Sequence, residues 1–127
     1  MRTYGAVAAG GVLGAAIRAF IVSQSPESPW VVAVINLMGC AVLAVILTRL
    51  VRAFSDSTWQ PLARPFFASG VMGGFTTTSA FAVNVVELSH HNAVEAIAYV
   101  VISVFGGYAL FDVIAKSAHS SDELRAP

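Results

Sequence analysis

The sequence predicts an all-α membrane protein that forms one domain over residues 1–127 with four transmembrane helices. Of its residues, 57% are hydrophobic and only 11% are charged, and the mean hydropathy is +0.75, whereas a soluble domain has about 25% charged residues. The formal net charge of +0 excludes a nucleic-acid-binding protein, which would need a basic excess. It also argues against a disordered chain, which combines low hydropathy with high net charge.

Long stretches without a charged side chain mark the helices that would cross the membrane. These stretches cover residues 3–17, 28–48, 65–86 and 96–111. A helix needs roughly 20 residues to cross a hydrocarbon core of ~30 Å, and apolar neighbours extend the shorter stretches to that length. We therefore predict spans at about 3–23, 30–50, 64–87 and 94–115. The connectors are too short for a soluble domain, and residues 117–127 form a polar tail.

The basic residues fall on one side of this topology. Six of the seven lie at the ends of the spans or beyond them on that side, namely Arg2, Arg49, Arg52, Arg64, Lys116 and Arg125. The opposite side carries Glu27, Glu87 and Glu95, and the seventh basic residue, Arg18, lies within the first span. By the positive-inside rule, we expect a multi-pass protein of the cell membrane with both termini in the cytoplasm and a single orientation.

The centre of the third span has a sequence unsuited to a continuous lipid-facing helix. Gly73 and Gly74 are followed by Phe75 and then by four hydroxyl residues at 76–79. Non-helical backbone at this depth is tolerated only where it is buried in protein or lines a cavity, and broken helices at the midplane often bind ions. We therefore predict a broken third helix. The alternative is an intact helix whose hydroxyl groups bond to carbonyls four residues back.

Polar and aromatic residues in the spans are candidates for an ion pathway. Asn36 can either donate its N–H groups into such a pathway or join two helices. The electropositive ring edge of Phe81 can face a small anion, although phenylalanine in a membrane helix more commonly serves packing. Tyr99 and Ser103 are four residues apart and share one face of the fourth span.

Arg18 shares a face of the first span with Gly10 and Gly14, which lie eight and four residues before it. A charge there needs a partner or a water-filled vestibule, unless the side chain extends to the interface. The pair of small residues Gly10 and Gly14, like Ser103 and Gly107, permits close helix contact within or between subunits. Because four helices are too few to enclose a wide pore, we expect an oligomer.

Arrangements typical of an enzyme are missing from the sequence. It contains no Ser/His/Asp set, no cluster with metal-ligand spacing and no nucleotide-binding loop. His90 and His91 lie in an expected loop, where they are more readily solvated than metal-bound. Cys40 is the single cysteine, which excludes an intrachain disulfide.

Each of the four spans carries a motif that fits one known family. The motifs are Gly10-Gly11-x-x-Gly14-Ala15-x-x-Arg18, then Asn36-x-x-Gly39, then Gly73-Gly74-Phe75-Thr76-Thr77 with Ser79 and Phe81, and finally Tyr99 with Ser103. In this order they resemble the motifs of the Fluc (CrcB) fluoride ion channels. The combination of the Gly-Gly-x-Thr-Thr segment with the asparagine is the most specific part of the resemblance.

The resemblance implies an antiparallel, dual-topology-type dimer with fluoride-selective pores that lets cytoplasmic fluoride leave the cell down its electrochemical gradient and so lowers fluoride toxicity. It also implies a structural, non-transported Na⁺ held by backbone carbonyls, here those of Gly73 and Thr76. Arg18 and Tyr99 would have structural or vestibule roles. The residues that would line the fluoride pathway are Asn36, Thr77, Thr78, Ser79, Phe81 and Ser103.

The sequence departs from the family pattern at Thr78, where the family has the first of two phenylalanines that face fluoride. A homodimer would therefore lack one ring in each pore. The strong bias of basic residues to one side also disfavours a homodimer, because antiparallel subunits must insert both ways. We therefore expect a heterodimer with an oppositely oriented paralogue, with a homodimer as the alternative.

Two other functions remain open at this point. The chain could be a non-conducting assembly subunit of a heterodimeric fluoride channel, which the Thr78 departure favours. It could also be a small multidrug-resistance-type transporter. That class needs a membrane-embedded carboxylate in the first helix, and the first span has no acidic residue.

Overall fold

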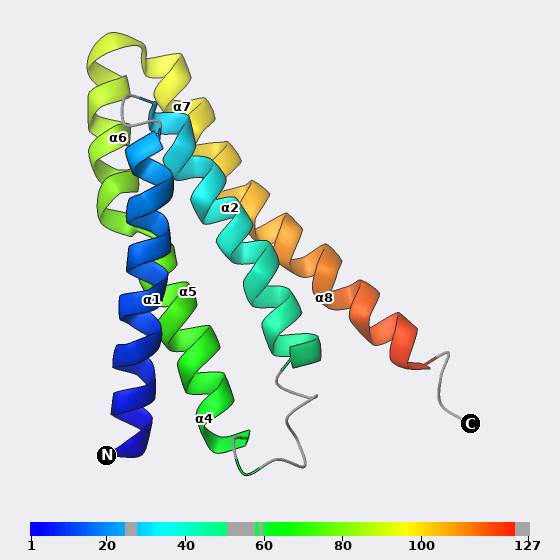
Figure 1. Cartoon of the computed structure of the whole chain (residues 1–127). Coiled ribbons are helices and arrows are strands. Elements are labelled where there is room, and N and C mark those ends of the chain that lie inside the picture. The colour runs from blue at the N-terminus through cyan, green and yellow to red at the C-terminus, as the bar shows by residue number, and fades with distance from the viewer. Residues whose placement is uncertain (25–27, 51–57, 59, 124–127) are drawn as a thin grey trace.

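The computed structural model describes residues 1–24, 28–50, 58 and 60–123, and the regular elements in this part of the chain are all helical (Figure 1). The α-helices are α1 (Arg2–Gln24), α2 (Pro29–Val45), α4 (Gln60–Arg64), α5 (Met72–Phe75), α6 (Thr78–His91), α7 (Ala93–Val101) and α8 (Gly107–Glu123). Segments with π-helical hydrogen bonding continue three of them, namely η1 (Ile46–Leu50), η2 (Pro65–Val71) and η3 (Ile102–Gly106). Glu27, Arg52, Arg125 and most of the first two predicted connectors lie outside the described residues.

Within the described residues, four helical segments are long and apolar enough to cross a membrane. They are Arg2–Gln24, Pro29–Leu50, Pro61–His91 and Ala93–Ala118. Each overlaps the corresponding predicted span, so the all-α fold with four apolar spans is confirmed. Helix α8 continues to Glu123, and the first part of the predicted polar tail is therefore helical.

The ends of the helices follow from local sequence. Pro29 occupies the start of α2, where its missing N–H and fixed φ angle are compatible with a first helical turn. Asn92 separates α6 from α7 and caps α7, because its side-chain oxygen accepts from the N–H groups of Val94 (3.0 Å) and Glu95 (3.3 Å). In the folded chain, the α6–α7 turn and the start of α2 lie at one end of the molecule, and the starts of α1 and α4 lie at the other (Figure 1).

Glycines bring α1 against η2 and α5. A Cβ atom on Gly70 would lie 2.7 Å from the carbonyl oxygen of Val7 and 2.9 Å from the Cα of Gly10. A Cβ on Gly14 would likewise collide with the backbone of Val71. Since no side chain fits between these backbones, larger residues would force the helices apart. Gly10 and Gly14 thus serve packing inside one chain.

Helix α2 lies between two hydrophobic clusters. One joins Ile35 and Ile46 to buried residues of η2 and α5, namely Val71, Met72 and Phe75. The other joins Ala33 to residues of α6 and α7, namely Leu88, Ala96 and Tyr99. On a further face of α2, Leu37 and Cys40 occupy the space that a Cβ on Gly106 or Gly107 would need, and the far end of α8 diverges from α2 (Figure 1). Helix α2 thus connects the two parts of the chain that contain the candidate site.

Candidate functional site

The helical path of the third span is interrupted between α5 and α6. Thr76 has φ −79° and ψ 159°, and Thr77 has φ −147° and ψ 116°, so both residues are extended. Extended backbone cannot continue the helical hydrogen bonds, and the groups that it frees need other partners. The interruption lies inside the Gly-Gly-Phe-Thr-Thr-Thr-Ser segment.

Asn36 of α2 provides the partners for Thr77. Its Nδ2 donates to the Thr77 carbonyl oxygen at 3.2 Å, and its Oδ1 accepts from the Thr77 N–H at 2.9 Å. One N–H of the amide nitrogen is thereby used, and the second has no acceptor within the described part of the chain. A half-buried amide donor is therefore available beside the interruption.

Hydroxyl groups complete this polar cluster. The Thr77 side chain, 9% exposed, caps α6 by accepting from the N–H of Ala80 at 3.2 Å. The same oxygen lies 3.2 Å from the Ser79 hydroxyl. The structure thus brings Asn36, Thr77 and Ser79 together, whereas Thr78 is exposed and forms no side-chain hydrogen bond with them.

The end of α5 presents backbone carbonyls. Thr76 folds back on this end, because both its N–H (3.0 Å) and its hydroxyl (2.9 Å) donate to the Met72 carbonyl oxygen. The N–H of Thr77 would reach the Gly73 carbonyl in a continuous helix, but it donates to Asn36 instead. The Gly73 carbonyl oxygen therefore does not accept the helical hydrogen bond from Thr77, and Gly73 is exposed.

Arg18 also binds the end of α5. Its Nε donates to the Gly74 carbonyl oxygen at 3.2 Å, and the side chain is half-buried. A positive charge at the carbonyl end of a helix is favourable, since the helix dipole is negative there. The structure therefore provides Arg18 with a partner in the third span.

Phe81 and Tyr99 form a second group toward the α6–α7 turn. Their rings stack with centroids 5.5 Å apart and an interplanar angle of 18°, and Tyr99 is fully buried. Trp30 meets the Tyr99 ring edge-on at 5.6 Å. Asn84 donates both to the Tyr99 hydroxyl oxygen (3.1 Å) and to the Pro29 carbonyl oxygen (3.2 Å). Tyr99 thus packs against one face of the Phe81 ring.

Ser103 is separate from both groups. It lies in η3, and its hydroxyl oxygen is buried without a hydrogen-bond partner among the described residues. Buried polar atoms nearly always have a partner in the protein or in ordered water. The Ser103 hydroxyl is therefore free to donate to a small bound species.

Sequence reasoning missed one member of the aromatic group, Trp30. Trp30 contacts Tyr99, and its indole N–H lies 3.4 Å from a carboxylate oxygen of Glu95. These residues are far apart in the chain, and no spacing rule connects them. A tryptophan directly after the first residue of an apolar span is the one available signal, because tryptophan favours membrane interfaces.

Comparison with known proteins gives a consistent result. The family model described as "CrcB-like protein, Camphor Resistance (CrcB)" matches residues 5–114, and so reaches all four spans. A "Fluoride-specific ion channel FluC 2" of Thermobifida fusca is 37% identical over 106 residues, covering 80% of this chain and 76% of the relative. "Fluoride-specific ion channel FluC 1" of Cutibacterium acnes is 36% identical, covering 87% and 80%. "Fluoride-specific ion channel FluC" of a Chelativorans species is 36% identical, covering 83% and 87%.

Proposed function

Because this chain belongs to the CrcB-like protein family, we propose that it is a subunit of a fluoride-specific ion channel. Such a channel lets cytoplasmic fluoride leave the cell down its electrochemical gradient and lowers fluoride toxicity. The chain is a multi-pass membrane protein, with four apolar helical spans. The names of its relatives and the polar cluster at the α5–α6 interruption support a channel rather than a multidrug transporter.

The main observation behind the proposal is the pair of hydrogen bonds between the Asn36 side chain and the Thr77 backbone. It holds an extended backbone segment inside the third span and leaves one amide N–H free beside the hydroxyl groups of Thr77 and Ser79. Fluoride is small and strongly hydrated, so a pore must replace its water with closely spaced donors. In our proposal, the Phe81 ring edge and the Ser103 hydroxyl continue this row of donors.

We propose that the carbonyl oxygens of Gly73 and Thr76, at the end of α5 and just after it, bind a structural Na⁺, since carbonyls freed where a helix is interrupted are suitable ligands for Na⁺. Gly73 is exposed, and a Cβ there would meet no atom within 4 Å. Further ligands would therefore come from a second subunit. The ion would neutralise the partial negative charge of these carbonyls and hold the interruption open.

The assembly that we propose is an antiparallel dimer, in which this chain pairs with an oppositely oriented paralogue. Arg2, Arg49 and Arg64 lie toward the end of the molecule where α1 and α4 begin (Figure 1), which by the positive-inside rule faces the cytoplasm in one fixed orientation. Relatives with the numbered names FluC 1 and FluC 2 support the existence of such pairs. The partner would supply the ring that Thr78 lacks.

The proposal is tested by fluoride efflux from liposomes that contain the purified chain, read with a fluoride electrode beside chloride-loaded liposomes. We expect fluoride efflux without chloride leak, with the paralogue added if the chain alone is silent. Asn36→Asp should lower the efflux about tenfold or more, because it places a negative charge beside the anion and removes the amide donor. Asn92→Asp is the matched control, since aspartate caps a helix as well as asparagine does.

Each outcome has a defined meaning. Efflux that Asn36→Asp abolishes and Asn92→Asp preserves supports the pore assignment. Efflux that appears only with the paralogue supports the heterodimer, whereas full efflux from the chain alone contradicts it. Continued silence with the paralogue present contradicts fluoride conduction and favours a non-fluoride or non-conducting role. Equal loss in both variants contradicts a pore role for Asn36.

A further inference from the structure

A cavity of about 740 Å³ lies between the start of α1 and the α4–η2 segment. Its volume is within the ~300–1,000 Å³ range of ligand pockets. The residues that line it are Arg2, Ala6, Thr58, Leu62, Ala63, Phe66 and Phe67. It is far from the Asn36–Thr77 pairing along the bundle, because it lies where α1 and α4 begin (Figure 1).

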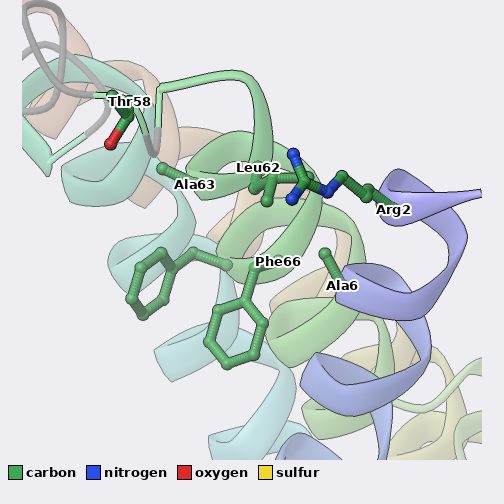
Figure 2. A pocket seen from close by; sticks show the side chains of 7 residues that line it. Arg2, Ala6, Thr58, Leu62, Ala63 and Phe66 are labelled. Atoms are coloured by element: carbon green, nitrogen blue, oxygen red, sulfur yellow. The ribbon is translucent and has the colours of Figure 1, made fainter.

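The lining of this cavity is amphipathic. Leucine, alanine and phenylalanine side chains form most of it, and one guanidinium and one hydroxyl group provide the polar part. Figure 2 shows the Arg2 side chain extending from α1 to Leu62 on the facing helix, while Ala6 faces the Phe66 side of the cavity. The cavity thus has an apolar interior and a cation at its edge.

Arg2 has no acidic partner in the described part of the chain, where the ion pair joins Lys116 and Asp112 on α8. Arg2 is also exposed. Arg49 and Arg64 are exposed toward the same end of the molecule and add to its positive potential. An unpaired guanidinium beside other arginines attracts anions, and phosphate oxygens suit its fork of donors.

The position of the cavity relative to the bilayer indicates which class of ligand it can bind. Arg2 and Pro61 begin the first and third apolar spans, so the cavity extends from the head-group level into the hydrocarbon region. Basic pockets between transmembrane helices on the cytoplasmic side bind anionic lipid head groups. Lipid acyl chains surround any such opening and match its alkyl and aromatic lining.

We propose that the cavity between α1 and the α4–η2 segment binds an anionic glycerophospholipid, with one acyl chain against Phe66 and Phe67 and the phosphate on Arg2. The Thr58 hydroxyl also lines the cavity, on the side away from the Arg2 guanidinium (Figure 2). This site does not depend on ion conduction. It would anchor the start of α1 to the segment that leads into α5.

Native mass spectrometry of the purified full chain in detergent tests the inference. The probes are dioleoylphosphatidylglycerol and dioleoylphosphatidylcholine, which share acyl chains and differ in head-group charge. We expect the anionic lipid to bind about fivefold more tightly, the effect of one basic residue near a membrane surface. Arg2→Gln should remove this preference, whereas Arg49→Gln, at the same end but outside the cavity, should preserve it.

A second pair of variants tests the apolar part. Ala6→Phe fills the cavity and should lower the binding of both lipids, whereas Ala9→Phe places the same ring on the exposed surface of α1 and should not. Equal binding of the two lipids by the unaltered chain overturns the charge assignment. Equal effects of Arg2→Gln and Arg49→Gln, or of the two phenylalanine variants, overturn the location. Displacement of lipid by glycerol 3-phosphate overturns the acyl-chain contact, because the site would then bind the head group alone.

Discussion

The polar cluster at the α5–α6 interruption and the aromatic group near the α6–α7 turn are held by different forces. At the interruption, Asn36 forms two hydrogen bonds with the backbone of Thr77, which has lost its helical partners. In the aromatic group, Phe81, Tyr99 and Trp30 meet ring to ring on regular helices. Hydrogen bonds therefore position backbone where the helix ends, and ring packing positions side chains where the helix continues.

Truncation of the aromatic group should have the largest effect on stability. Tyr99 is fully buried and contacts both Phe81 and Trp30, so Tyr99→Ala should lower the free energy of unfolding by about 3–5 kcal/mol. The midpoint of thermal unfolding in detergent measures this loss. Tyr99→Phe keeps the rings together and removes only the acceptor for Asn84, and should cost about 1 kcal/mol. Similar losses in both variants would mean that the hydrogen bond, not the ring, holds this group.

Removal of the amide at the interruption should have an intermediate effect on stability and a large effect on conduction. Asn36→Leu keeps the approximate volume of the side chain but leaves the N–H and carbonyl of Thr77 without their partner. Each unsatisfied buried group costs about 1–3 kcal/mol. We expect a lower unfolding midpoint together with lost fluoride efflux. Unchanged efflux in a destabilised protein would restrict Asn36 to a structural role.

Loss of the cap on α6 should have the smallest effect. Thr77→Val removes the hydroxyl that accepts from Ala80 and contacts Ser79, while the backbone bonds to Asn36 persist. The loss of a helix cap costs about 1 kcal/mol, which the unfolding midpoint measures. Thr77→Ser retains the hydroxyl and serves as the control. If serine behaves like valine, the methyl group of Thr77 matters more than its hydroxyl.

The spans could be predicted from the sequence because a bilayer imposes length and composition on each helix separately. The uncharged stretch 28–48, for example, lies almost entirely within the helical segment Pro29–Leu50. The two glycines and four hydroxyl residues at 73–79 predict a change in the helical path, and Thr76 and Thr77 in this segment have extended backbone. Glycine and hydroxyl side chains weaken a helix through local effects, which a sequence displays directly.

The partners of the candidate residues could not be predicted in the same way. Asn36 was equally compatible with helix packing and with an ion pathway, and its pairing with Thr77 joins residues 41 positions apart. The Trp30–Tyr99 contact and the Arg18–Gly74 bond likewise link different spans. These contacts depend on how the helices rotate and cross, and a single sequence carries no direct record of that.

The sequence by itself determined that this chain has four helical spans apolar enough to cross a membrane. This property follows from the solvent that each residue meets and from local backbone preferences. Only the tertiary structure decided that Asn36 supports the Thr77 backbone, that Arg18 binds the end of α5, and that Tyr99 covers one face of Phe81. The physical reason is that close contact of α1 with η2 and α5 at Gly10, Gly14 and Gly70, and the place of α2 between two clusters, determine which side chains meet.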